Sequence, residues 1–283
     1  AALSALTVAR WLGVALWLTA AAALGVAIDR LHVSRRRWFA LSLIATSAPL
    51  AAWCSAGMET GLVTSLAALA VAGRCLGWER CAMAAAGVAA ALRPELVAWA
   101  GVVAVAGQPD DARPVARWLR LALALGPAAA VALTRLALFG RAYPLSLLAK
   151  PSDLRHGVLY ATASALLCGV VAMVAWRRIP PWLRGLQAAV VTHLLALCVA
   201  GGDWMPLSRL MVPVLPTLVV CAAFVLAEGH VAWTALRLTL ALAGQLFVLV
   251  KIGPRARLVA GKRSEVMRQL GPALASARSV ASL

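Results

Sequence analysis

Four short polar motifs carry the residues that could do chemistry in this 283-residue chain. In order, they are Gly57-Met58-Glu59-Thr60, Arg93-Pro94-Glu95, Tyr143-Pro144 through Lys150-Pro151, and Gly201-Gly202-Asp203-Trp204-Met205-Pro206 with Arg209. A lysine can hold a phosphate as a point charge, and glycines let backbone approach a ligand closely. Ionisable residues at bilayer depth are candidates for function by default. The candidate binding residues are therefore Glu59, Arg93, Glu95, Lys150, Asp203 and Arg209.

Each motif also has a purely structural interpretation. Glu59 could cap the helix that begins near residue 60, because acidic side chains suit helix N-termini. Arg93 and Glu95 could form a local ion pair that stabilises a broken helix. Lys150 could be an interfacial lysine whose ammonium group reaches the headgroups. Asp203 and Arg209 could form a salt bridge across a turn. The sequence leaves both interpretations open for every motif.

Composition identifies the class of protein that must position these motifs. Hydrophobic residues make up 63% of the chain and charged residues only 13%, with 27 bases against 10 acids. A soluble domain is about half apolar and a quarter charged, so this chain has too little polar surface to cover itself. The composition excludes a soluble enzyme, a disordered tail and, despite a net charge of +17, a nucleic-acid-binding domain. The bases are 24 Arg and three Lys, which with the abundant Ala indicates a high-GC coding sequence.

The apolar segments predict an all-α bundle of about ten membrane crossings, because a helix needs about twenty apolar residues to cross the hydrocarbon core. The predicted crossings are 12–28, 39–56, 60–73, 81–92, 95–107, 118–139, 156–176, 183–200, 210–227 and 231–250. Pro94 disfavours helix at Arg93, so 81–92 and 95–107 form a broken hairpin. Residues 1–250 are the transmembrane domain, and 251–283 form a basic tail. The six cysteines are scattered without metal-ligand spacing, so neither a metal nor a cofactor is predicted.

The distribution of bases predicts which side of the membrane each loop occupies. One alternating set of loops holds thirteen bases and the other six. The positive-inside rule places the richer set in the cytoplasm. The four polar motifs then all lie on the extracytoplasmic side, and so do both termini.

The motifs resemble those of a known enzyme family. Ser55-Ala56-Gly57-Met58-Glu59-Thr60-Gly61-Leu62, Leu92-Arg93-Pro94-Glu95, and the two later segments are similar, in the same order, to motifs of bacterial GT-C membrane glycosyltransferases. The closest group is the terminal arabinofuranosyltransferases of the mycobacterial cell wall and their homologues, over about residues 40–220.

The resemblance implies a GT-C fold in the plasma membrane, with its active face extracytoplasmic. The donor would be a polyprenyl-phosphate sugar and the acceptor an envelope glycan or lipid. Basic residues among Glu59, Arg93, Glu95, Lys150, Asp203 and Arg209 would hold the lipid phosphate, and acidic ones the sugar or acceptor hydroxyls.

The sequence departs from the family at its beginning. In the family the catalytic Asp lies in the first outer loop, after the first helix, whereas this chain has no acid before Asp29. We therefore expect the chain to lack its first helix and first outer loop, which leaves the catalytic residue unknown and Asp203 as the only substitute. A transporter or lipid-handling protein, suggested by the broken helices, and a catalytically inactive scaffold are the alternatives.

Overall fold

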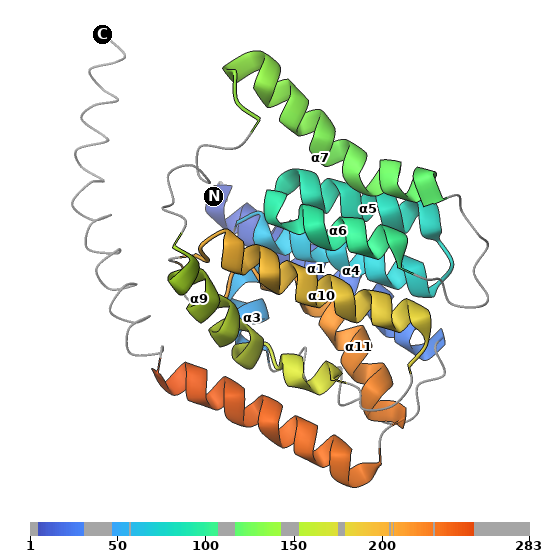
Figure 1. Ribbon diagram of the computed structural model, residues 1–283, viewed down its shortest axis with the longest axis vertical. Coiled ribbons are helices and arrows are strands. Elements are labelled where there is room, and N and C mark those ends of the chain that lie inside the picture. The colour runs from blue at the N-terminus through green and yellow to red at the C-terminus, as the bar shows by residue number, and fades with distance from the viewer. Residues whose placement is uncertain are drawn as a thin grey trace.

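The computed structural model shows a bundle of helices (Figure 1). It describes residues 5–30, 47–56, 58–106, 117–142, 153–174, 179–203, 205, 207–228 and 230–251. Within these ranges the regular elements are α-helices and short 3-10 helices, without a strand. The predicted all-α class is therefore confirmed for the part of the chain that the structure describes.

The elements follow the predicted apolar segments closely. In chain order they are α1 (Ala5–Arg30), α3 (Ala48–Cys54), α4 (Thr60–Cys75), α5 (Glu79–Leu92), η1 (Pro94–Leu96), α6 (Val97–Val105), α7 (Arg117–Phe139), α9 (Leu154–Leu167), η2 (Val170–Met173), α10 (Pro181–Val199), η3 (Val212–Val214) and α11 (Leu215–Glu228). A further helix spans Val231–Lys251.

Four of the described helices are long and apolar enough to cross a membrane. They are Thr7–Arg30 within α1, α7, α10 and Val231–Lys251. The helix α4 has 16 residues, which at about 1.5 Å per residue is shorter than a hydrocarbon core of about 30 Å. The structure thus supports a membrane protein with four candidate spans, and the larger number of crossings remains a prediction.

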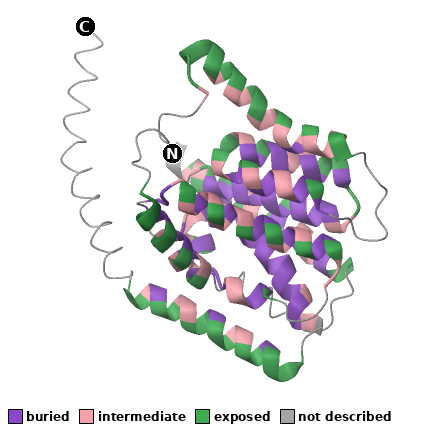
Figure 2. Ribbon diagram, in the orientation of Figure 1, coloured by how far each residue is buried: buried purple, intermediate pink, exposed green. Residues whose placement is uncertain are grey.

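Burial separates an inner group of helices from an outer pair. The side chains of α4, α5, α6 and α11 make most of the core, which Figure 2 shows in purple at the centre of the bundle. In contrast, α7 and Val231–Lys251 lie along opposite edges (Figure 1), with only 6% and 17% of their apolar windows buried. Exposed Phe139 and Phe247 belong to these two helices. Apolar surface of this extent suits contact with lipid rather than water.

Two breaks in the helices have local causes. Arg93 has extended backbone (φ −135°, ψ 102°) before Pro94, as predicted from the restriction that proline places on the preceding residue. The predicted crossing 156–176 is not one continuous helix, because α9 ends at Leu167 and Gly169 adopts a left-handed conformation (φ 68°) before η2. A Cβ on Gly169 would stand 3.2 Å from the Ala241 side chain. The contact with the Val231–Lys251 helix therefore favours glycine at this break.

Glycines allow several helices to approach a neighbouring backbone. A Cβ on Gly87 of α5 would collide with the Leu123 carbonyl of α7, and one on Gly157 of α9 with the Cys198 carbonyl of α10. Pro127 lacks the N–H that would otherwise bond Leu123 within the helix, so this carbonyl is free to face Gly87. Small residues at such crossings are typical of membrane helices, which associate by close packing.

Replacing Gly87 with alanine is expected to destabilise the protein by about 1–3 kcal/mol, because the new methyl group would meet the Leu123 carbonyl and the Pro127 ring. Thermal unfolding in detergent measures the effect. The matched control is Gly126→Ala in α7, where a Cβ meets nothing within 4 Å and helix propensity favours alanine by up to about 1 kcal/mol. Equal stability of the two variants would contradict the packing described for α5 and α7.

Candidate functional site

Five of the six predicted binding residues come together at one end of the bundle. Glu59 precedes α4, Arg93 separates α5 from η1, Glu95 lies in η1, and Asp203 and Arg209 lie between α10 and η3. We call these five residues the motif cluster. The sixth predicted residue, Lys150, lies outside the described residues, as do Gly57, Trp204 and Pro206.

Arg93 is the centre of the first half of the motif cluster. Its side chain is only 4% exposed, and its Nη2 donates to Glu59 Oε1 at 2.8 Å and to Thr60 Oγ1 at 2.7 Å. Its Nη1 lies 3.4 Å from Glu95 Oε1. The predicted local Arg93–Glu95 pair is present, but the shorter contact joins Arg93 to a carboxylate 34 positions earlier in the chain. One buried guanidinium thus fixes α4 against η1.

Both carboxylates of this half keep access to the surface. The side chain of Glu59 is 47% exposed and that of Glu95 is 19% exposed. Glu59 occupies the N-cap position of α4 but makes no side-chain cap, so its carboxylate serves Arg93 rather than the helix end. A ligand could therefore reach the free oxygens of Glu59 and Glu95 without displacing the buried part of Arg93.

The second half of the motif cluster is the Asp203–Arg209 pair. Arg209 Nε and Nη2 each lie 3.0 Å from Asp203 Oδ2, and the Asp203 side chain has no exposed surface whereas that of Arg209 is 15% exposed. The Trp53 ring lies beneath the guanidinium, 6.0 Å from its centroid to Arg209 Cζ. The predicted salt bridge across the turn is confirmed. The part of the Arg209 guanidinium that does not contact Asp203 therefore faces the surface, between the Asp203 carboxylate and the Trp53 indole.

The backbone that carries Asp203 and Arg209 adopts conformations that few residues accept. Leu207 and Ser208 have positive φ values of 58° and 53°, a left-handed conformation that costs about 1–3 kcal/mol for a non-glycine residue. Leu207 is held there by Trp53 Nε1, which donates to its carbonyl at 3.2 Å. Gly202 has a φ of 72°, and a Cβ on it would stand 2.6 Å from the Tyr160 side chain. This strained turn sets the direction of Arg209.

Three further polar side chains support the cluster. Tyr160 Oη accepts from the Leu210 N–H at 3.2 Å, His156 Nδ1 lies 2.7 Å from the Gly201 carbonyl, and both ring nitrogens of His193 face carbonyls. His193 is thus a buried residue held between backbone carbonyls. Tyr160 and Trp53 were missed as site residues. The signal available for Tyr160 was its phenol within an apolar helix, since the chain has only two tyrosines.

The two halves of the cluster also act on each other electrostatically. Burial by itself would raise the pKa of Glu59, but a backbone hydrogen bond and the charges of Arg93 and Arg209 outweigh it, so the pKa lies below its usual value of 4.5. Glu59 therefore stays ionised at neutral pH and links Arg93 with Arg209 through its charge.

Glu59 is expected to contribute stability at neutral pH that disappears in acid. A carboxyl group whose pKa is lowered by folding stabilises the protein above its unfolded pKa and stops doing so as the pH falls through its folded pKa. The melting temperature of Glu59→Gln should therefore lie below that of the parent protein at pH 7 and converge with it below about pH 4. A difference between the two proteins that stays constant over this range would contradict the Glu59–Arg93 interaction.

Comparison with known proteins identifies no relative. No family model matches the chain, and no curated protein or solved structure matches it either. The resemblance to the GT-C family therefore rests on the four motifs alone.

A second charged cluster lies at the other ends of α4 and α5. Arg74 at the end of α4 pairs with Glu79 at the start of α5 at 3.3 Å, and both are buried. Arg74 and Arg120 donate to the same carbonyl, that of Ala106, at 3.2 and 3.3 Å. Arg74 and Glu79 lie at the end of α4 and the start of α5, whereas Glu59 and Arg93 of the motif cluster lie at the opposite ends of these two helices. This second cluster is therefore separate from the motif cluster.

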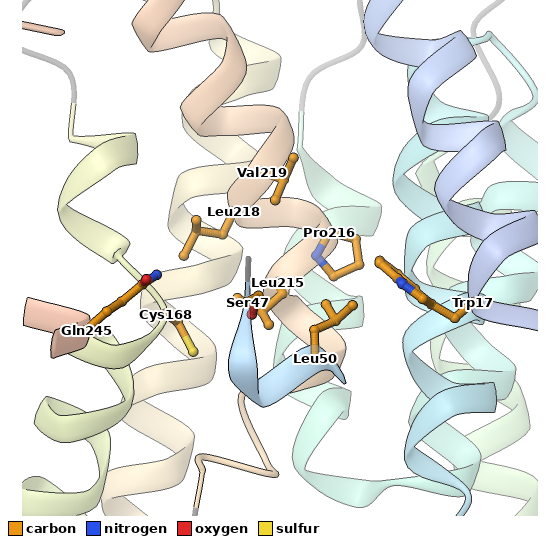
Figure 3. A pocket seen from close by; sticks show the side chains of 9 residues that line it. All are labelled: Trp17, Ser47, Leu50, Cys168, Leu215, Pro216, Leu218, Val219 and Gln245. Atoms are coloured by element: carbon orange, nitrogen blue, oxygen red, sulfur yellow. The ribbon is translucent and has the colours of Figure 1, made fainter. Parts of the chain in front are cut away.

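A small cavity apart from the motif cluster is formed by the described residues. These residues contain no group of three or more His, Cys, Asp or Glu side chains suited to a metal ion. A cavity of about 10 Å³ lies between α1, α3, α11 and the Val231–Lys251 helix (Figure 3). Ser47 and Gln245 are its polar lining, and the Ser47 hydroxyl has no hydrogen-bond partner among the residues that the structure describes. This volume holds at most about one water molecule, so the cavity is no site for a substrate.

Proposed function

We propose that the protein is an integral-membrane glycosyltransferase of the GT-C type, in the plasma membrane of a high-GC bacterium. It moves a sugar from a polyprenyl-phosphate donor to a cell-envelope glycan or lipid, on the extracytoplasmic face. The chain would cross the membrane about ten times, with short broken helices that bring the motifs to the donor headgroup. The transferred sugar is a pentose or a hexose, and the motifs resemble those of the terminal arabinofuranosyltransferases.

One observation carries the proposal: residues from three separate motifs meet in one charged cluster at the end of an apolar bundle. Arg93 reaches Glu59 and Glu95, and Arg209 reaches Asp203. A donor with an apolar chain and a phosphate headgroup requires this combination of lipid-facing helices and cations near their ends. Five charged groups that sit together without such a ligand would be costly to keep near the bilayer, which supports a functional role.

The chemistry and the exposure of each residue in the motif cluster indicate its role in binding. The exposed edge of Arg209 would bind the donor phosphate, as would Lys150 if it lies nearby, since a guanidinium forms strong charge-assisted bonds to phosphate. Glu59 and Glu95 would accept hydrogen bonds from sugar or acceptor hydroxyls. In the reaction an acceptor hydroxyl oxygen attacks the anomeric carbon, the bond from that carbon to the phosphate oxygen breaks, and the hydroxyl proton passes to the departing phosphate or to water. The electron pair leaves with polyprenyl phosphate, whose charge the bases stabilise.

We assign no general base among the described residues. Asp203 was the only substitute for the family's catalytic Asp, but its carboxylate has no exposed surface and accepts two contacts from Arg209. A paired and shielded carboxylate is poorly placed to take a proton from an acceptor hydroxyl. We therefore give Asp203 a supporting role, namely to orient Arg209.

A catalytically inactive scaffold is the second candidate. It is favoured by the fact that Arg93 is already engaged: its two Nη atoms contact Glu59, Thr60 and Glu95. A scaffold of this kind would still bind the lipid-linked sugar through Arg209 but would not transfer it. Transport, the other alternative, has less support, because the second buried charged cluster joins helix ends rather than lining a path between helices.

The proposal is tested with the purified chain in nanodiscs. Radiolabelled polyprenyl phosphate should bind saturably, and Arg209→Gln should weaken binding at least about tenfold, equivalent to the loss of one charge-assisted contact. Arg80→Gln, at an exposed base in α5, is the matched control and should bind as the parent does. Addition of a polyprenyl-phosphate pentose and envelope glycan to the full-length protein should then yield a glycosylated product.

The outcomes separate the candidates. Absence of saturable binding, or equal loss in the Arg209 and Arg80 variants, would overturn the proposal. Binding without product would favour the scaffold. Substrate-dependent flux across proteoliposomes, without product, would favour transport. Circular dichroism at the assay temperature shows whether Arg209→Gln remains folded.

A further inference from the structure

Two arginines share one hydrogen-bond acceptor in the second charged cluster, which lies at the end of the bundle opposite the motif cluster. Arg74 Nη2 donates to the Ala106 carbonyl at 3.2 Å, and Arg120 Nη1 donates to the same oxygen at 3.3 Å. The two guanidinium groups are therefore neighbours, and the charge of Arg120 acts unfavourably on that of Arg74. A carbonyl oxygen has no net charge, so it cannot balance the two bases.

The carboxylate of Glu79 balances only one of these two positive charges. Its Oε2 contacts Arg74 Nη1 at 3.3 Å, and the Glu79 side chain is 1% exposed. Two arginines and one glutamate leave a formal charge of +1. The Nε atom of Arg120 is buried without an acceptor among the described residues, which is costly for a charged donor. Arg120 is therefore the base in this cluster that lacks an anionic partner in the described part of the chain.

Arg120 belongs to a helix that is open to lipid. It lies in the first turn of α7, which follows the edge of the bundle (Figure 1) and has only 6% of its apolar window buried. Arg117 is exposed and precedes Arg120 by three residues, so the two side chains share one face of α7. The Trp118 indole beside them is 70% exposed, and tryptophan is enriched at the level of the lipid headgroups. The first turn of α7 thus combines bases with an interfacial aromatic residue.

We propose that Arg117 and Arg120 bind the phosphate of an anionic phospholipid, whose acyl chains lie along α7. The phosphate supplies both the acceptor that Arg120 Nε lacks and the negative charge that the cluster lacks. A lipid fits this position better than a soluble anion does, because the bases continue directly into the exposed apolar surface of α7. The loops at this end are among those predicted to face the cytoplasm, and the cytoplasmic leaflet is negatively charged.

The lipid site is independent of the proposed glycosyl transfer. Glu59 and Arg74 lie near opposite ends of α4, about 22 Å apart along the helix axis at about 1.5 Å per residue. A phospholipid bound at α7 would offset the repulsion between Arg120 and Arg74 and hold the start of α7 at the level of the headgroups. The folded protein should therefore be more stable in a bilayer that contains anionic lipid.

The first experiment measures lipid binding by native mass spectrometry of the protein released from detergent micelles. The parent protein should retain phosphatidylglycerol at least about tenfold better than phosphatidylcholine, which has no net charge, as expected for two bases beside an anionic headgroup. The combined variant Arg117→Gln with Arg120→Gln should lose this preference. Arg141→Gln is the matched control, because Arg141 is an exposed base beyond the other end of α7, and it should keep the preference. Equal retention of the two lipids by the parent protein would overturn the proposal, and so would equal loss in the two variants.

The second experiment compares thermal unfolding in nanodiscs made from either lipid. A ligand that binds only the folded protein stabilises it, so the parent protein and Arg141→Gln should melt at a higher temperature in phosphatidylglycerol than in phosphatidylcholine. The combined variant should melt at the same temperature in both. Arg117→Gln alone changes an exposed side chain, so it should fold as the parent does and lose part of the difference. A difference that persists undiminished in the combined variant would refute the assignment of these two bases.

The same assays identify two other anions that could occupy the cluster. Displacement of phosphatidylglycerol by inorganic phosphate at equal concentration would show that the site takes a soluble ion. Asp110 and Asp111, which lie outside the described residues, are the second alternative. If they neutralise the arginines, the parent protein will show no lipid preference, and the variant with both replaced by asparagine will acquire one. Either result would overturn the proposal.

Discussion

Replacing Arg93 with methionine is expected to lower the free energy of unfolding by about 3 kcal/mol, because carboxylates would be left near the bilayer without their guanidinium. Arg93 is 4% exposed and contacts Glu59, Thr60 and Glu95. The cost lies at the lower end of the range for buried ion pairs, since Glu59 is 47% exposed and water can solvate part of its charge. Denaturant titration in detergent measures the loss. Arg93→Lys should lie between the parent and Arg93→Met, because an ammonium cannot span all three partners.

A combined variant separates the structural role of Arg93 from its role in binding. Removing the two carboxylates together with the base, as Arg93→Met with Glu59→Gln and Glu95→Gln, leaves no unpaired charge and should restore most of the stability. If the cluster binds a phosphate and hydroxyls, the same variant should still fail to bind polyprenyl phosphate. Recovery of both properties would show that Arg93 and its partners only hold the fold. Arg80→Met, at an exposed position, should change stability by less than about 0.5 kcal/mol.

Removal of Arg209 is expected to cost more than removal of its partner. Arg209→Gln leaves the Asp203 carboxylate, which has no exposed surface, and should destabilise by about 3 kcal/mol. Asp203→Asn leaves a guanidinium that is 15% exposed, lies over Trp53 and interacts with Glu59, so its cost should be about half as large. Under the proposed function only the Arg209 variant should lose phosphate binding by about tenfold or more, because Asp203 acts through Arg209.

A double-mutant cycle tests the pair directly. The coupling energy between Asp203→Asn and Arg209→Gln should be about 2 kcal/mol, as for groups in one buried network. Asp203→Asn combined with Arg80→Gln should be additive within about 0.5 kcal/mol, because Arg80 belongs to another part of the bundle. A coupling energy near zero for the first pair would contradict the geometry of the Asp203–Arg209 bridge.

The sequence predicted the helices well wherever hydropathy and proline decide them. The segment 118–139 is α7, and the break before Pro94 lies where steric restriction of Arg93 requires it. The break at Gly169 was missed, although a left-handed glycine directly after the C-cap residue is a common way for a helix to end. Hydropathy also counts apolar segments without showing whether a short one crosses the bilayer. For that reason ten segments were predicted as crossings, and four described helices have the length to cross.

The candidate site was predictable as a set but not in its connections. The alternation of loops along the chain predicted that the motifs lie on one side of the membrane. The proximity of Glu59, Arg93 and Arg209 in the structure agrees with that prediction. The bond from Arg93 to Glu59 and the stacking of Arg209 on Trp53 depend on tertiary packing. No pattern of spacing distinguishes Trp53 from the other ten tryptophans. Likewise, the two carbonyl groups that face His193 belong to distant segments, so the sequence near His193 does not predict them.

The glycine contacts described above also determine the axial alignment of the helices. Gly13 of α1 lies against Gly61 of α4, and a Cβ on Gly61 would stand 3.1 Å from the Gly13 Cα. Sliding one helix by a single residue, about 1.5 Å, would bring a side chain to the place where only hydrogen fits. Gly157 stops α9 against α10 in the same way, three residues before Tyr160. These close contacts keep the helices from sliding along their axes. They therefore keep Glu59 and Tyr160 at fixed positions along the bundle axis, to within a fraction of a helical turn.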